Sequence, residues 1–279
     1  PKRFMFEYCC ADNSYLKTLA GEGCQVEQVT EHHDARTKTG LAHAQFECRK
    51  AKNAGKRGLL WSSIPCVGGS ARNTMNPARH TESFRRRLQS HRADFNLMWE
   101  NFETLAREVH AWGWKIAIEW PYNCRYWKLK KVRDLLRDCG CQIARIRGCA
   151  VGLVDDLGVP IAKPWHVATN DVFVWKALEA RRHCPGGADH TKHAECQGKY
   201  ARMSESYTPS MARLIHNAWV DSVNTRGQPR STASRPAAAS VVSRDHVLPC
   251  CVGPVLQPEG DTTPGAPAKV RDPERCYYM

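Results

Sequence analysis

Short apolar segments alternate with longer stretches of helical periodicity over the first 182 residues, and this alternation limits the possible folds more than any other feature. Strands alternating with helices predict an α/β protein with a largely parallel sheet. The turn-forming sequence VDDLG lies between the last two apolar segments and predicts an antiparallel hairpin there. The predicted strands are 4–10, 25–30, 58–63, 115–119, 142–147 and 165–169.

The clearest helix is predicted from Thr81 to Ala111, because apolar residues recur there at steps of three and four. Further helices are expected at 127–138, 171–182 and 208–221. After these the chain becomes rich in Pro, Ser, Ala and Gly without apolar periodicity, which predicts a disordered tail. The expected regions are an α/β domain over 1–182, a Cys/His-rich extension with a terminal helix over 183–222, and the tail over 223–279.

Charge and cysteine content indicate the kind of partner and the redox compartment of the chain. Lys and Arg outnumber Asp and Glu by 41 to 28, and the resulting charge of +13 favours nucleic acid as the partner. The 14 cysteines occur in a long chain whose first residues do not form a signal peptide. We therefore expect reduced thiols and a nuclear or cytoplasmic, non-secreted protein. No apolar run approaches the roughly 18 residues of a membrane span, so no membrane partner is expected.

Reactive side chains stand at the ends of several predicted strands. The segment GLLWSSIPCVGG carries Cys66 in a Pro-Cys turn, and KIAIEWP delivers Glu119 to the end of the next strand. Glu31 ends the second strand, where an acidic residue commonly accepts hydrogen bonds from ribose hydroxyls. Ligands of open α/β sheets bind outside these carboxyl ends. A thiol and a carboxylate in such places favour chemistry over packing.

In their order along the chain, these residues resemble the S-adenosylmethionine-dependent cytosine-C5 methyltransferases. In that family a Pro-Cys turn supplies a thiolate that adds to C6 of a flipped-out cytosine, a Glu on the next strand binds the base, and an Arg-x-Arg pair positions both. The resemblance implies these roles for Cys66, for Glu119 and for Arg145 and Arg147 in QIARIRG. It also implies a Rossmann-like methyltransferase sheet with S-adenosylmethionine beside Glu7, Cys10, Glu31 and Pro65.

The chemistry of this reaction accounts for the residue types. Cytosine C5 is a poor nucleophile until a soft thiolate adds at C6. The ring accepts that addition when a carboxyl group of raised pKa donates to N3. A base inside a duplex must be flipped out to reach such a site, and basic residues hold the backbone. The expected function is therefore methyl transfer from S-adenosylmethionine to cytosine C5, in DNA more than in RNA.

A glycine-free loop keeps a second interpretation open. The family has Phe-x-Gly-x-Gly after the first strand, whereas this chain has FEYCCADNS at 6–14. The alternative is a catalytically inactive, methyltransferase-like nucleic-acid-binding protein of the kind that a mobile element encodes. Two weaker interpretations also exist. One is an amino-methyltransferase, whose motif residues 63–66 match only in part. The other is a thiol-dependent enzyme of another kind, which would need a histidine near Cys66.

Four metal-binding side chains fall within 13 residues in CPGGADHTKHAEC. They are Cys184, His190, His193 and Cys196, and their thiols and imidazoles are the ligand types of tetrahedral zinc. The spacing matches no common zinc finger, so a polar loop with incidental Cys and His is the alternative. A zinc ion here would be structural, because the segment has little apolar content of its own.

Overall fold

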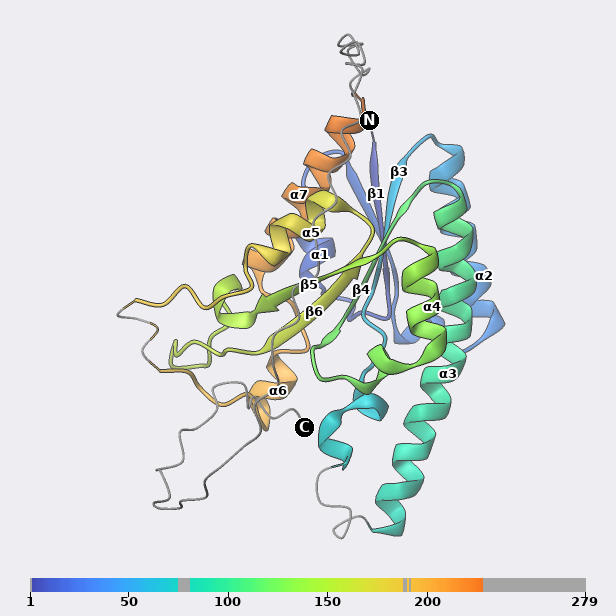
Figure 1. Cartoon of the computed structure of the whole chain (residues 1–279). Helices are drawn as coiled ribbons and strands as arrows, with labels where there is room; N and C mark the ends of the chain where they lie inside the picture. Colours follow the sequence, from blue (N-terminus) through green and yellow to red (C-terminus); the bar gives the residue numbers. More distant parts are fainter. Residues whose placement is uncertain (1, 75–80, 188–189, 191, 228–279) are drawn as a thin grey trace, which may run out of the picture. The chain divides into compact units, whose positions relative to one another are not determined.

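A computed structural model describes residues 2–74, 81–187, 190 and 192–227. Six strands form one mixed sheet in the order β2-β1-β3-β4-β6-β5 (Figure 1). β2, β1, β3 and β4 are parallel, and β6 runs antiparallel to both of its neighbours, β4 and β5. The α/β class and the antiparallel pairing of the last two strands are thus confirmed. The strands are β1 (Arg3–Tyr8), β2 (Cys24–Val29), β3 (Arg57–Ser62), β4 (Lys115–Pro121), β5 (Gln142–Arg147) and β6 (Pro164–Thr169).

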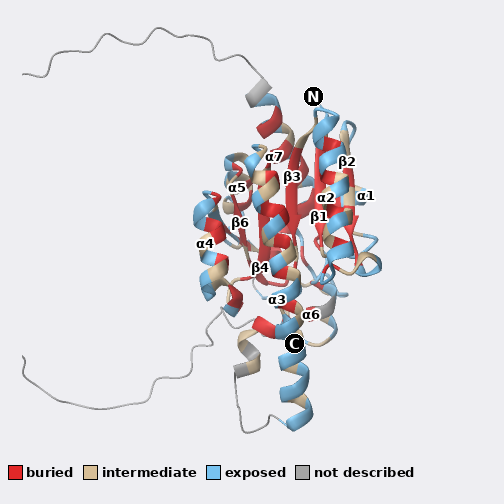
Figure 2. Cartoon of the chain, turned by 90° about the vertical axis from the view of Figure 1, so that its right-hand side faces the viewer, coloured by how far each residue is buried: buried red, intermediate tan, exposed pale blue. Residues whose placement is uncertain are grey.

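Helices cover both faces of the sheet. Figure 1 shows α2, α3 and α4 on one side and α1, α5 and α7 on the other, and Figure 2 shows the strands buried between them. The short helix α6 (Lys199–Met203) precedes α7. The helices on the two faces are α1 (Tyr15–Thr18), α2 (Lys38–Asn53), α3 (Glu82–Ala111), α4 (Lys130–Asp138), α5 (Val172–Glu179) and α7 (Pro209–Gly227).

Aromatic side chains of α3 fill the core on the first face. Trp99 is fully buried, with its ring centroid 5.6 Å from that of Phe102 and 5.8 Å from that of Trp120 in β4. The three- and four-residue periodicity seen in the sequence therefore corresponds to the stripe that packs on the sheet. Trp120 continues the cluster beyond the helix, because alternate residues of β4 face α3.

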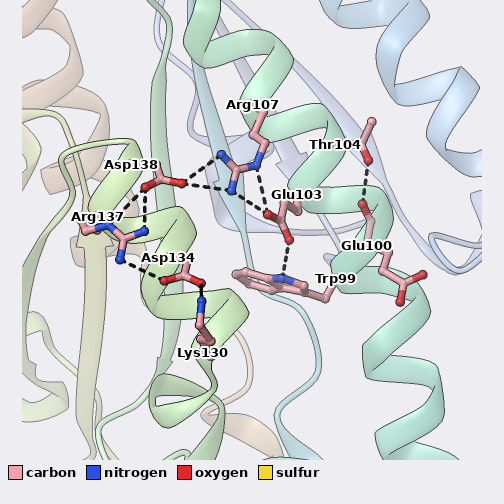
Figure 3. Close-up of polar contacts among 9 residues, drawn as sticks. All are labelled: Trp99, Glu100, Glu103, Thr104, Arg107, Lys130, Asp134, Arg137 and Asp138. Atoms are coloured by element: carbon pink, nitrogen blue, oxygen red, sulfur yellow. Dashed lines mark hydrogen bonds and ion pairs between the residues drawn. The ribbon is translucent and has the colours of Figure 1, made fainter.

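Polar side chains join α3 to α4 at the surface beside this core (Figure 3). Arg107 of α3 pairs with Glu103 at 2.8 Å and with Asp138 of α4 at 3.2 Å. The indole N–H of Trp99 donates to the other carboxylate oxygen of Glu103 at 3.2 Å. These ion pairs are partly exposed to solvent, so each contributes little to the free energy of unfolding.

The segment after residue 182 shares the core of the second face and does not form a core of its own. Met211, Ile215 and Trp219 of α7 are buried together with Ala117 of β4 and Leu178 of α5. α7 extends to residue 227, so the start of the predicted tail, 223–227, is helical. The remainder of that tail, 228–279, lies outside the described residues.

Within the described residues, α2 is the one long helix that the sequence pattern did not predict. It begins after Thr37, whose hydroxyl accepts a hydrogen bond from the N–H of Gly40 at 3.0 Å. Its buried face consists mainly of the small residues Ala44, Cys48 and Ala51, which give a weak hydrophobic signal. No helix in the described part of the chain has both the length and the apolar character needed to cross a bilayer.

Candidate active site

The carboxyl ends of β1, β2 and β3 border a cavity of about 670 Å³. Strand order reverses at β1, because β2 lies on one side of it and β3 on the other, and ligands of open α/β sheets bind at this kind of position. Three predicted cofactor-binding residues line the cavity, namely Cys10, Glu31 and Pro65. Further lining residues include Val67 and Gly68 of the Pro-Cys turn and His91, Asp94 and Met98 of α3.

The loop after β1 turns tightly without a glycine. Cys9 has a φ of 61°, in the left-handed region that favours glycine. The N–H groups of Cys9 and Cys10 both donate to the carbonyl of Val29, at 2.9 and 3.2 Å, and so tie the loop to the end of β2. The backbone thus makes a turn of the kind that a glycine would allow, but it keeps a side chain at the cavity wall.

Glu7 supports this loop from below and does not line the cavity. Its buried carboxylate accepts hydrogen bonds from the hydroxyl of Ser14 at 2.6 Å and from the amide of Gln28 at 3.1 Å. Burial raises the pKa of Glu7, and the two hydrogen bonds act against that rise. Ser14 also caps α1, so the interaction of Glu7 with Ser14 fixes where the loop ends. The loop lies between Glu7 and the cavity, so the predicted contact between Glu7 and a cofactor would be indirect.

The Pro-Cys turn that carries Cys66 is held from both sides. The indole N–H of Trp120 in β4 donates to the carbonyl of Ile64 at 2.7 Å. The guanidinium of Arg92 in α3 donates to the carbonyl of Gly68 at 3.2 Å. A Cβ atom at Gly69 would lie 2.9 Å from the ring of Tyr126, so this position requires a glycine. The turn is therefore a rigid support for a half-buried thiol.

Glu119 enters a buried polar network on the second face of the sheet. The hydroxyl of Tyr207 donates to Oε2 of Glu119 at 3.2 Å. The same hydroxyl accepts from the indole N–H of Trp61 at 2.8 Å and lies 2.6 Å from the hydroxyl of Ser63. Because Tyr207 gives its one proton to Glu119, Ser63 must be the donor in the last bond. The carboxyl group at the end of β4 is thus oriented by residues from β3 and from the segment before α7.

Electrostatics join Cys66 to Glu119. Burial raises the pKa of the Cys66 thiol to about 11, and the negative charge of Glu119 adds to the rise. Burial also raises the pKa of Glu119 to about 7. The buried ammonium of Lys163 lowers both pKa values and donates to the carbonyl and hydroxyl of Ser204, at 2.8 and 3.0 Å. A Glu119 that is protonated near neutral pH no longer opposes ionisation of Cys66.

Arg145 and Arg147 lie away from this pair. Strand pairing aligns Trp120 with His166 and His166 with Arg145, so these three side chains share the first face of the sheet, opposite to Glu119. Two strand spacings, about 10 Å, separate β5 from β4. The arginines line a second cavity of about 460 Å³ together with Tyr122, Pro164, Trp165, His166, Arg182 and His183. The structure therefore does not bring the four predicted catalytic residues together.

The predicted metal ligands also separate. Cys184 and His193 lie together, with Sγ 3.5 Å from Nε2. Cys196 is buried in the core of the second face, where its sulfur lies 3.4 Å from the hydroxyl of Ser204. Cys149, which follows β5, takes the third position beside Cys184 and His193. Sequence spacing could not reveal Cys149, because it lies 35 residues before Cys184.

Two residues of the site were missed by sequence reasoning. Lys163 lies just before β6, and Tyr207 lies in the stretch SESYTP before α7. A lysine in the apolar sequence PIAKPW was the available signal, since a buried ammonium needs polar partners. For Tyr207 the sequence held no such signal, because its partners lie 88 and 146 residues away.

The comparisons with known proteins assign no family. The scan against protein-family models found no match to this chain, and the search of curated proteins found none either.

Proposed function

We propose that the chain is a Rossmann-like methyltransferase that transfers a methyl group from S-adenosylmethionine to cytosine C5 in DNA through the thiolate of Cys66. The observation that carries the proposal is the cavity where strand order reverses, which is lined by Pro65 and Val67 on either side of Cys66. Cys66 lies in the turn after β3, and its thiol is electrostatically coupled to Glu119 near the end of β4. In doubly wound sheets a nucleotide-like cofactor binds at such a switch point.

The residues of the cavity fit this cofactor. Glu31 lies just after β2, where a carboxylate suits the ribose hydroxyls. Pro65 and Met98 offer apolar surface for an adenine ring, and the volume is within the range of roughly 300–1,000 Å³ typical of small-molecule sites. When bound, S-adenosylmethionine supplies the methyl group that C5 receives.

The protein's own side chains carry out the other steps of the proposed reaction. The Cys66 thiolate forms a bond to C6 of the flipped base, which makes C5 nucleophilic. Protonated Glu119 donates to N3 and stabilises the negative charge that develops on the ring. Tyr207 holds Oε2 of Glu119, which leaves Oε1 for the base. Water then accepts the C5 proton, the electron pair of the C5–H bond forms the C5–C6 double bond, and the C6–S bond breaks to release the Cys66 thiolate. Lys163 takes the thiolate-stabilising role that the resemblance gave to the arginine pair.

Transfer of labelled methyl groups to a random-sequence DNA pool tests this mechanism. We expect Cys66→Ala to lower the rate by more than about a thousandfold, because the nucleophile is lost. Cys141→Ala is the matched control, since Cys141 is also a half-buried free thiol but lies before β5. A Cys66→Ala protein that is folded and fully active would remove the mechanism.

A second candidate function is nucleic-acid binding without catalysis. The glycine-free loop after β1 and the high pKa of Cys66 favour it, because both weaken the requirements for methyl transfer. Calorimetry with S-adenosylmethionine separates the two functions. Heat of binding that is lost when Glu31 is replaced by Ala supports the methyltransferase, whereas no binding at millimolar cofactor supports the binding protein.

A further inference from the structure

We propose that Cys149, Cys184, His193 and His190 bind one zinc ion, which joins the end of β5 to the segment after α5. The first three residues offer Sγ, Sγ and a ring nitrogen that all lie within 4.8 Å of one another. Two thiolates and two imidazoles form one of the common ligand sets of structural zinc. The site is independent of the proposed methyl transfer.

The separation of Cys184 and His193 agrees with tetrahedral geometry. Zn–S bonds of about 2.3 Å and Zn–N bonds of about 2.0–2.1 Å at a tetrahedral angle place sulfur and nitrogen about 3.6 Å apart. Sγ of Cys184 lies 3.5 Å from Nε2 of His193. The ligands therefore need little movement to accept the ion.

His190 is the fourth ligand because its ring is close and its nitrogen is unsatisfied. Its ring centroid lies 5.9 Å from that of His193. Within the described residues, its Nε2 is buried without a hydrogen-bond partner, which is costly for a polar atom unless something binds it. Rotation of one imidazole toward the two sulfurs would satisfy this atom.

The backbone explains why Cys149 and Cys184 meet despite their distance in sequence. The N–H of Arg147 donates to the carbonyl of Arg181 at 2.9 Å, and that of Gly148 donates to the carbonyl of Lys163 at 2.8 Å. The chain after β5 thus runs against the chain after α5, with one cysteine a few residues beyond each contact. The positive charge of Arg147 acts on both Cys149 and His193, and thiolate charge on the two cysteines offsets its repulsion of a metal ion.

Metal analysis of the full-length protein, purified under reducing conditions and equilibrated with zinc, tests the proposal. We expect one zinc per chain, and a cobalt-substituted form with the absorption of a tetrahedral two-thiolate site. Cys184→Ser and His193→Gln should each weaken zinc binding by more than about tenfold, because each removes a ligand. His193 is exposed, so this variant remains informative if the cysteine variant fails to fold.

Cys196→Ser is the matched control, because it removes a neighbouring cysteine that lies outside the cluster. It should keep the zinc. Loss of zinc in Cys196→Ser with retention in Cys184→Ser would overturn the proposal. A wild-type protein that takes up no zinc, or one whose Cys149 and Cys184 are recovered as a disulfide, would overturn it as well.

Discussion

Tyr207 supplies the hydrogen-bond partner of two buried polar side chains on the second face of the sheet. It is the acceptor for Trp61 and the donor to Glu119. Tyr207→Phe leaves the indole N–H of Trp61 without its acceptor, so we expect a loss of about 1–3 kcal/mol in the free energy of unfolding. Tyr200→Phe, which removes a hydroxyl bonded to exposed Asp156, should cost less than about 0.5 kcal/mol. Urea denaturation of both variants measures the contrast, and equal losses would contradict the network.

Titration of Glu119 makes the free energy of unfolding depend on pH, and the raised pKa of this group sets the direction. Its pKa is about 7 in the folded protein and 4.5 in an unperturbed chain. Between these values the folded state keeps a proton that the unfolded state has released, so stability falls as pH rises through this window. At about 1.4 kcal/mol for each unit of pKa, the loss amounts to roughly 3.5 kcal/mol.

Glu119→Gln tests this dependence because it removes the titrating group. The variant should gain stability relative to the wild type as pH rises from 4.5 to about 7, with no further gain above that. Denaturation curves of the two proteins across this range give the difference directly, because Cys66, whose pKa depends on Glu119, stays protonated over the whole range. A difference that stays constant with pH would show that Glu119 does not have a raised pKa.

The helix α3 packs on the first face of the sheet through the buried side chain of Trp99 (Figure 3). Trp99→Ala should lower the free energy of unfolding by about 3–5 kcal/mol, because a fully buried indole leaves a cavity between aromatic neighbours. Leu97→Ala on the same helix is the control, since the Leu97 side chain is 48% exposed. It should change stability by less than about 0.5 kcal/mol. Similar losses in both variants would contradict the assigned packing face.

The elements were predictable where one local pattern decides them. All six strands lie within two residues of their predicted positions, because each apolar run is short and bounded by turns. α3 was predictable from its long stripe of large apolar residues. α2 was not, because the small side chains of Ala44, Cys48 and Ala51 can pack against a sheet without a strong hydrophobic signal.

The parts of the site were predictable only where strand ends decide them. Cys66 and Glu119 were recognised because Cys66 lies in the turn that follows an apolar strand and Glu119 lies near the end of the next one. The position of Arg145 depends instead on pairing across β4, β6 and β5, and this register put it on the face opposite Glu119. Cys149 and Tyr207 reach their partners through tertiary contacts, which no spacing in the sequence encodes.

For the whole molecule, the surplus of basic residues predicts salt-sensitive binding to DNA. Nearly all of the +13 charge lies before residue 228. Arg182 lines the cavity that also contains Arg145 and Arg147, at the carboxyl end of β5, which runs in the same direction as β4. If Arg182 contacts a DNA phosphate, Arg182→Ala should reduce the slope of the logarithm of DNA affinity against the logarithm of salt concentration by about 1.

Fluorescence anisotropy with a duplex over a range of salt concentrations measures this slope. Arg49→Ala on α2 is the control, because Arg49 is also exposed but pairs with Glu108 on the other side of the molecule. It should leave the slope unchanged. Equal effects of the two substitutions would indicate that the charge acts as a whole and that the second cavity has no special part in binding.

The most direct measurement of the central claim is covalent trapping of the protein on DNA that contains 5-fluorocytosine, with S-adenosylmethionine present. Fluorine at C5 leaves no proton to remove after methylation, so Cys66 cannot be expelled. We predict an adduct of wild-type protein that survives denaturing electrophoresis and is absent from Cys66→Ala. An adduct that persists without this sulfur, or a wild-type protein that binds both cofactor and DNA yet forms none, would contradict the account.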